Sequence, residues 1–199
     1  MKGYGGAYTG FTGRDGSSAF FRAGFCVMTP IRAAILTVSD RGFKGERADL
    51  SGPALAQWLA ERSVEVVSSK LVPDATEGIS AQLKEWADSG CCDLILTTGG
   101  TGVSPRDRTP EATRRILDLE IPGIGEAMRA ASFGKTPFAV LSRAAAGARG
   151  RTLIVNLPGS PQGAVENLAV VWPAIPHAVK KLQGDASDCV PAIAKPETP

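Results

Sequence analysis

From residue 31 onward, the chain alternates short apolar runs rich in β-branched residues with stretches whose apolar residues recur every three or four positions. The first pattern is typical of buried strands and the second of helices packed on one side. The run DLILTT at 93–98 is apolar on both faces, as expected for a central parallel strand. Repeated strand–helix–strand units join parallel strands through right-handed crossovers. The predicted fold is α/β, a three-layer α/β/α arrangement around a mostly parallel, doubly wound sheet.

The expected elements follow this alternation along the chain. Strands are predicted at residues 33–39, 64–72, 93–98, 138–142 and 152–157. Helices are predicted at residues 52–63, 76–89, from 109 onward, at 161–171 and at 173–183. Thr109 is expected to be the N-cap of its helix, with Pro110 in the first turn and Glu111 at the positive end of the helix dipole.

The length favours one domain. A chain of 199 residues that is 43% hydrophobic can bury one sizeable core, while two full domains would be cramped. That domain is predicted at 31–183, followed by a disordered tail at 184–199. Residues 1–30 are rich in glycine and serine and contain one acid. They are interpreted as a disordered extension, an organellar targeting segment, or an artefact of an upstream start that precedes Met28.

Charge and hydropathy exclude two classes of partner. No stretch approaches the eighteen apolar residues of a membrane span, so no membrane partner is expected. The net charge is +2, and no basic cluster is denser than two adjacent residues, so no nucleic acid partner is expected either. The predicted location is cytoplasmic, with organellar targeting by residues 1–30 as the alternative.

The cysteines and the histidine narrow the chemistry. The chain has Cys26, Cys91, Cys92 and Cys189 but no C-x-x-C motif, which supports neither a disulfide framework nor a zinc site. Reduced thiols that pack in the fold are expected. The single histidine, His177, lies in the last predicted helix and is interpreted as structural. Any catalysis must therefore use carboxylates, hydroxyls, backbone amides and a metal.

Four loops that follow predicted strands carry the unusual residues of this chain. In open parallel sheets, ligands bind beyond the carboxyl ends of the strands, so these loops are expected to share one rim. In chain order, the loops contain Ser39 and Asp40; Asp74; Thr98 to Gly102 with Asp107 beyond; and Asn156 with Gly159 and Ser160.

The glycine-rich loop TTGGTG is a candidate phosphate site. Glycines at 99, 100 and 102 permit backbone conformations barred to other residues, so the loop amides can form an anion-binding concavity. The hydroxyls of Thr98 and Thr101 lie alongside in the sequence. The alternative is a tight structural turn, and a glycine-rich loop alone is weak evidence against it.

Asp74 and Asp107 suggest a metal at the same rim. Each follows a strand end beside a proline-containing turn. Two carboxylates near bound phosphates are a common way to hold magnesium, which keeps several waters and bridges phosphate oxygens. The alternative is a pair of turn or N-cap aspartates. An acid pair and an amide concavity without a histidine favour phosphoryl or nucleotidyl transfer, which depends mainly on positioning and charge neutralisation.

At these residues the chain resembles the molybdopterin adenylyltransferase family, which includes bacterial enzymes of molybdenum-cofactor synthesis and the amino-terminal G domain of gephyrin. The resemblance covers roughly residues 31–183, and six blocks stand in the right order. They are TVSDR, DLSGP, VPDA, LTTGGTGVSPRDRTPEAT, PGIGEAMR and LSRAAAGARGRTLIVNLPGSPQGAVE.

The resemblance implies an enzyme that joins AMP from ATP to the terminal phosphate of molybdopterin, with Mg²⁺, and releases pyrophosphate. It implies a homotrimer with an α/β/α fold, and a molybdenum-insertion enzyme is a candidate partner. The main alternative is a non-catalytic molybdopterin-binding carrier or scaffold, and a generic nucleotide-binding module is a second. Because both aspartates and the full glycine block are present, the enzyme is favoured.

The resemblance also implies roles for individual residues. Asp74 and Asp107 are expected to be catalytic and to hold Mg²⁺ with phosphate oxygens. The residues expected to bind phosphate and substrate are Ser39, Asp40, Thr98, Gly99, Gly100, Thr101, Gly102, Asn156, Gly159 and Ser160. Asp49, Ser142 and Arg143 are placed in the same pocket. Arg108 departs from the small apolar residue usual in the family, and it faces either solvent or the pocket.

Overall fold

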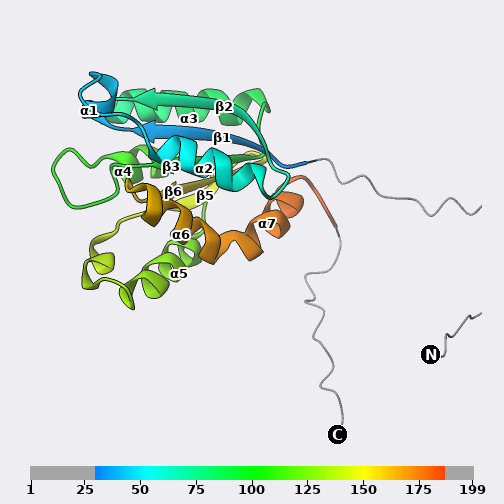
Figure 1. Cartoon of the computed structure of the whole chain (residues 1–199). Helices are drawn as coiled ribbons and strands as arrows, with labels where there is room; N and C mark the ends of the chain where they lie inside the picture. The colour runs from blue at the N-terminus through cyan, green and yellow to red at the C-terminus, as the bar shows by residue number, and fades with distance from the viewer. Residues whose placement is uncertain (1–29, 187–199) are drawn as a thin grey trace, which may run out of the picture.

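A computed structural model describes residues 30–186 of the chain, so the extension predicted before residue 30, the tail beyond 186, Cys26 and Cys189 lie outside the described residues. Within that range the strands form one six-stranded sheet in the order β2-β1-β3-β6-β5-β4 (Figure 1). The parallel strands are β1 (Arg32–Val38), β2 (Glu65–Val72), β3 (Leu94–Thr98) and β6 (Thr152–Leu157). The antiparallel edge consists of β4 (Leu119–Glu120) and β5 (Ala146–Arg149).

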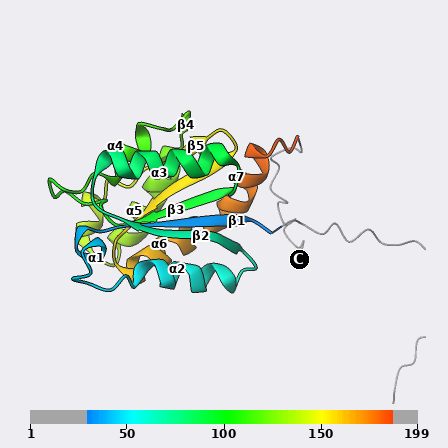
Figure 2. The ribbon, with the colours of Figure 1, turned by 90° about the horizontal axis from the view of Figure 1, so that it is seen from above.

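Helices cover both faces of this sheet (Figure 2). One face packs against α2 (Ser51–Ala60), α5 (Pro122–Phe133), α6 (Pro161–Val171) and α7 (Ile175–Leu182). The other face packs against α3 (Thr76–Ser89) and α4 (Thr109–Arg114). The remaining elements are the short helix α1 (Asp40–Phe43) and the 3₁₀ turns η1 (Pro137–Leu141) and η2 (Trp172–Ala174).

The alternation of side chains along the strands explains why the core has two halves. Ala33 and Ile35 of β1 belong to one apolar cluster, while Ala34 and Leu36 belong to the other. All five residues of β3 are buried, which follows from its place between β1 and β6 with helices on both faces. The predicted α/β class and three-layer arrangement are confirmed.

Four predicted strands and most predicted helices are confirmed within a few residues of their bounds. The strand predicted at 138–142 is wrong, because this segment forms the 3₁₀ turn η1. Thr136 accepts a hydrogen bond from the amide of Phe138 and so starts the turn, and Phe138 is 74% exposed. An apolar run therefore lies on the surface instead of in the sheet. The antiparallel strands β4 and β5 and helix α5 were not predicted.

The start of α4 also differs from the expectation. Arg108 occupies the N-cap position without a side-chain hydrogen bond, and Thr109 is the first helical residue. The Thr109 hydroxyl donates instead to the carbonyl of Gly99, at 2.9 Å. The expected cap therefore ties the helix to the glycine loop, while Pro110 and Glu111 lie in the first turn as predicted.

Cys91 and Cys92 precede β3 as free thiols. Burial raises the pKa of Cys92 to about 12, which keeps this thiol protonated and fits the packing role predicted for it. His177 lies on α7 and does not line the cavities described below. Among residues 30–186, no helix is long and apolar enough to cross a membrane.

Candidate active site

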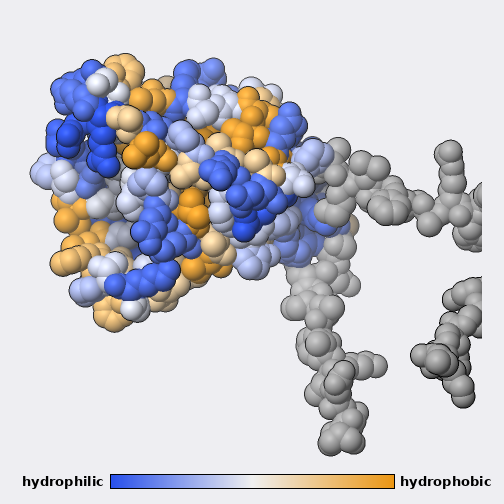
Figure 3. Space-filling model, in the orientation of Figure 1, coloured by the Kyte–Doolittle hydropathy of each residue, from blue (hydrophilic) through white to orange (hydrophobic). Residues whose placement is uncertain are grey.

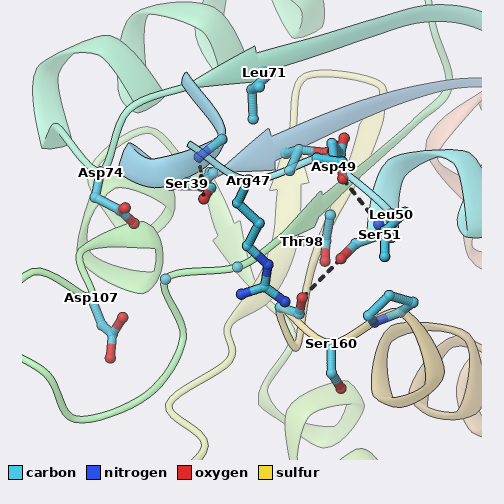
Figure 4. A pocket seen from close by; sticks show the side chains of 18 residues that line it. Ser39, Arg47, Asp49, Leu50, Ser51, Leu71, Asp74, Thr98, Asp107 and Ser160 are labelled. Atoms are coloured by element: carbon cyan, nitrogen blue, oxygen red, sulfur yellow. Dashed lines mark hydrogen bonds between the residues drawn. The ribbon is translucent and has the colours of Figure 1, made fainter. Parts of the chain in front are cut away.

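A cavity of about 340 Å³ opens beyond the carboxyl ends of β1, β3 and β6 (Figure 4). The four loops expected at one rim meet here. From the sequence-predicted set the cavity is lined by Ser39, Asp49, Asp74, Thr98, Gly99, Gly100, Asp107, Gly159 and Ser160. The structure therefore brings together three aspartates, three of the predicted glycines and the beginning of α6, which starts at Pro161 on the cavity wall.

Asp40 and Asp74 form two reciprocal hydrogen bonds, in which the side-chain carboxylate of each accepts from the backbone amide of the other. The amide of Asp40 donates to Asp74 Oδ2 at 2.8 Å, and the amide of Asp74 donates to Asp40 Oδ1 at 3.0 Å. Ser39 begins α1 by accepting a hydrogen bond from the amide of Gly42. The loops after β1 and β2 are thereby locked together, and Asp40 supports Asp74 without itself lining the cavity.

The environment of Asp74 disfavours its charged form. Burial raises the pKa of its carboxyl, and the nearby negative charges of Asp40 and Asp107 raise it further. The hydrogen bond from the Asp40 amide and the positive charge of Arg106 act in the opposite direction but do not cancel the rise. A carboxyl with a raised pKa in a cavity is a candidate functional group, because burial and neighbouring like charges are common at such sites.

The glycine loop makes room for both carboxylates. Gly99 and Gly100 have φ values of 101° and 64°, which L-residues with side chains rarely adopt. A Cβ at Gly100 would lie 3.2 Å from Asp74 Oδ1, and a Cβ at Gly102 would lie 2.9 Å from Asp107 Oδ2. A Cβ at Gly99 would overlap with the carbonyl oxygen of Val38. Glycine is thus required here for close approach as well as for backbone conformation.

The threonine hydroxyls are placed differently from the expectation. Thr98 lines the cavity, but its hydroxyl donates to the carbonyl of Pro158 at 2.7 Å and links the loops after β3 and β6. Thr101 and Gly102 line a neighbouring cavity instead. The Thr98 hydroxyl and the Gly99 amide, which donates to the carbonyl of Leu157 at 3.2 Å, are therefore both used within the protein.

Asn156 does not reach either cavity. It is fully buried, and its amide nitrogen donates to the hydroxyls of Thr97 and Thr113 at 3.0 and 2.9 Å. Its side-chain oxygen accepts a hydrogen bond from the amide of Ala145 at 3.2 Å. The structure gives Asn156 a supporting place beneath the rim, in contrast to its expected position in the pocket.

Asp49 lines the cavity, although both of its oxygens have partners. Oδ1 accepts from the amides of Ser51 and Gly52 at 2.9 and 3.0 Å, at the start of α2. Oδ2 accepts from the Thr37 hydroxyl at 2.7 Å. The Ser51 hydroxyl in turn donates to the carbonyl of Gly159 at 2.8 Å, so this network fixes the wall of the cavity opposite Asp107.

A second cavity of about 400 Å³ lies between α5, η1, α6 and the glycine loop. Its wall is mainly apolar, and it includes Met128, Phe138 and Leu141. Ser142, which was expected in the carboxylate pocket, lines this second cavity. Ser160 lines both cavities, so the two spaces adjoin at the beginning of α6.

Two arginines have clear positions relative to the carboxylate cavity. Arg108 is exposed to solvent and does not line it. Arg143 does not line it either, and lies behind the loop that carries Asp107, where it donates to the carbonyls of Gly102 and Asp107. The expected placement of Arg143 in the pocket is therefore replaced by a contact with the back of the loop.

Sequence reasoning missed one prominent residue. Arg47 extends its side chain into the cavity (Figure 4), and it is the only lysine or arginine among the lining residues. Within residues 30–186 no carboxylate lies at ion-pair distance from Arg47, although three aspartates line the same cavity. Arg47 lies in an irregular polar loop, where no local pattern marks it as a site residue. The only sequence signal was that it lies two residues before the block DLSGP.

The substitution Gly99→Ala tests the close approach of the glycine loop to β1. We expect it to lower the free energy of unfolding by about 2–4 kcal/mol, combining the cost of a positive φ with overlap at Val38. Gly45→Ala is the matched control, because Gly45 has a φ of 75° and open space around its Cβ position. Urea denaturation measures both variants. Equal losses would show that the contact with Val38 contributes nothing.

The raised pKa of Asp74 predicts that Asp74→Asn increases thermal stability at neutral pH. A raised pKa favours the protonated form in the folded state, so the native protein loses stability as pH rises from 3.8 through the folded-state value. The melting temperature of Asp74→Asn should exceed that of the wild type at pH 7, and the difference should vanish below pH 3.8.

Asp93→Asn is the control of opposite sign. Burial raises the pKa of Asp93, but hydrogen bonds from Arg32 outweigh this and leave it lowered. Its contribution is present above pH 3.8 and is lost as pH falls through the folded-state value. This variant should melt below the wild type at pH 7. A lower melting temperature for Asp74→Asn as well would contradict the assignment for Asp74.

Comparisons with known proteins identify the family of this chain. Residues 34–177 match the family model described as a probable molybdopterin binding domain. A molybdopterin adenylyltransferase of Helicobacter pylori is 42% identical over 160 residues, covering 79% of this chain and 91% of the relative. Gephyrin of Dictyostelium discoideum is 43% identical over 167 residues, covering 79% of this chain and 23% of its own length.

A solved structure extends the agreement to the fold. The molybdopterin biosynthesis enzyme MoaB of Thermus thermophilus superimposes with a TM-score of 0.74 at 55% sequence identity, covering 78% of this chain and 98% of that one. The resemblance inferred from six sequence blocks is thereby confirmed. The chain belongs to the family of molybdopterin-binding domains.

Proposed function

We propose that this protein is a molybdopterin adenylyltransferase, which transfers AMP from ATP to the phosphate of molybdopterin and releases pyrophosphate. One observation carries the proposal: a cavity lined by carboxylates and glycine amides adjoins an apolar cavity at Ser160. A nucleotide phosphate chain suits the first cavity, and the flat pterin suits the second. The proposal agrees with the names of the bacterial relatives.

The beginning of α6 would orient the two phosphate groups toward each other. Ser160 and Pro161 lie at the cavity, and the positive end of the helix dipole favours anions there. Pro161 has no N–H and the amide of Gly163 donates to Ser160 Oγ at 3.1 Å, so the dipole is the main contribution of this helix. The backbone amide of Gly100 is a further donor across the cavity, whereas the amide of Gly99 donates to the carbonyl of Leu157 at 3.2 Å. Groups that the fold already holds in place stabilise charge without reorganising during the reaction.

The transfer needs no protein nucleophile. A phosphate oxygen of molybdopterin attacks the α-phosphorus of ATP, a new P–O bond forms, and the bond to the β-phosphate oxygen breaks with pyrophosphate as leaving group. Since the attacking phosphate is already an anion, no general base is required. Arg47 is the cation placed to hold the phosphates that leave.

Magnesium fits the donor set of this site. Asp74 and Asp107 face one cavity, and no group of three or more metal-binding side chains exists within residues 30–186. Two carboxylates leave room for waters and phosphate oxygens, which is the coordination that Mg²⁺ prefers. Bound there, Mg²⁺ would neutralise charge on the phosphates, and the raised pKa of Asp74 supports a cation at this position.

Self-association is part of the proposal. Phe133, Phe138, Val140 and Leu141 are exposed apolar side chains on α5 and η1, in a region where apolar surface gathers (Figure 3). Such a cluster supports a contact between copies of this chain, and the homotrimer implied by the resemblance is checked by sedimentation of the purified protein. A handover to a molybdenum-insertion enzyme and a cytoplasmic location stay predictions.

The proposed activity predicts pyrophosphate release that requires both ATP and molybdopterin. Asp107→Ala should lower kcat by about 10²–10³-fold, and Asp74→Asn should lower turnover far more than it changes thermal stability, because each removes a carboxylate proposed to hold Mg²⁺ against the reacting phosphates. Asp118→Asn, at an exposed aspartate outside both cavities, is the matched control.

Wild-type pyrophosphate release no higher than that of Asp107→Ala would identify a non-catalytic molybdopterin-binding carrier. ATP binding without molybdopterin binding would identify a nucleotide-binding module.

Arg47→Ala should raise KM for ATP by about 10–100-fold, which corresponds to the loss of one charge-assisted hydrogen bond to a phosphate. KM for molybdopterin should change little, since the pterin is assigned to the other cavity. Arg41→Ala is the matched control, because Arg41 is an exposed arginine of α1 that does not line the cavity. Equal effects of the two variants would remove Arg47 from the site.

A further inference from the structure

Asp107 is carried by a loop that leaves the glycine segment and returns to α4. The base of this loop is closed by Thr109, whose amide donates to the carbonyl of Gly100 at 3.2 Å. Its far turn is closed by Ser104, whose amide donates to Asp107 Oδ2 at 2.8 Å and whose carbonyl accepts from the Asp107 amide at 2.9 Å. These bonds fix the two ends of the loop. They do not connect Gly102, on the outgoing half, with the carbonyl of Asp107, on the returning half.

Arg143 joins the two halves. Nε donates to the carbonyl of Gly102 on the outgoing half, at 2.6 Å. Nη2 donates to the carbonyl of Asp107 on the returning half, also at 2.6 Å. Nη1 pairs with the carboxylate of Glu111 in the first turn of α4, and the backbone amide of Arg143 donates to Thr101 at 2.9 Å. One guanidinium thus binds three separate parts of the loop and its helix.

The segment that carries Arg143 is itself held firmly. Arg129 of α5 donates to the carbonyls of Ser142 and Ala144, at 3.3 and 3.4 Å. The buried side chain of Asn156 accepts from the amide of Ala145, at 3.2 Å, and so ties the segment to β6. The central sheet is therefore connected to the backbone of Asp107 through the hydrogen bond of Asn156 to Ala145, the backbone from Ala145 to Arg143, and the Arg143 guanidinium.

We propose that Arg143 is the positioning residue that holds the Asp107 carboxylate in the cavity. This role rests on the proposed function only because that function makes Asp107 a catalytic residue. Arginine is required because its planar fork offers donors in fixed directions, which suits three acceptors at once. Lysine keeps the charge and the pairing with Glu111 but cannot bind Gly102 and Asp107 in the same geometry. Arg143 does not line the carboxylate cavity, so it acts through Asp107.

The first test measures the loop without any need for activity. Trypsin can cleave after Arg106 and Arg108, which both lie in this loop and are exposed. We expect Arg143→Ala to be cleaved there at least several times faster than the wild type, with Arg143→Lys in between. Arg114→Ala is the control, since Arg114 lies on α4 and forms an exposed ion pair with Glu120 at 2.9 Å. Wild-type cleavage of Arg143→Ala would overturn the proposal.

The second test separates positioning from stability. In Arg143→Lys, kcat should fall by about 10²-fold while KM for both substrates changes little, as expected for a misplaced catalytic group. Guanidinium ion at low concentration should restore part of the activity of Arg143→Ala and none of that of Asp107→Ala. A lower melting temperature with unchanged kcat would assign Arg143 a purely structural role and overturn the proposal.

The two tests also separate this proposal from the proposed function. If the wild type transfers no AMP, the adenylyltransferase assignment fails, but the protease experiment still decides whether Arg143 holds the loop. If the wild type is active and Arg143→Lys retains full kcat, the assignment of the enzyme stands and the positioning role fails.

Discussion

The site depends on how closely the backbone after β3 can approach the end of β1. Gly99 lies against the carbonyl of Val38, and Gly159 after β6 lies against Gly99 in turn, so the ends of β1, β3 and β6 meet without intervening side chains. Any Cβ at Gly99 would push β1 and β3 apart at their carboxyl ends. Because parallel strands direct their loops to one edge, this single close contact decides whether the carboxylates of separate loops share a cavity.

The sequence was sufficient for the elements that repeat a simple physical pattern. The run DLILTT is β3 because a strand buried on both faces must be apolar throughout, and the loops at its rim follow from the parallel connection. The segment 138–142 has the same apolar character but remains on the surface, because Pro137 and the Thr136 hydroxyl start a 3₁₀ turn. Strand β5, with the sequence AGAR, could not be predicted for the opposite reason, because it has no large apolar side chains to mark it as a buried strand.

The candidate site was predictable as a set of loops but not as a set of contacts. Asn156 stands beside the predicted turn, yet its side chain is used beneath the rim to bind Thr97, Thr113 and Ala145. Thr109 looks like an N-cap in the sequence and instead holds the glycine loop. Arg47 lies in a polar stretch that no local pattern distinguishes. Several polar groups in each loop could point into the cavity. The group that does so depends on partners far away in the sequence, and local propensity carries no information about those partners.

The crowding of Asp40, Asp74 and Asp107 constrains how a lineage of such proteins can evolve. A neutral residue at position 74 removes an unfavourable charge from the folded state, so mutations that increase stability and mutations that abolish the site coincide there. Selection for a stable fold alone would therefore not favour a charged residue at position 74. An acid kept at a position where the fold alone disfavours its charge is consistent with the proposed cation beside it.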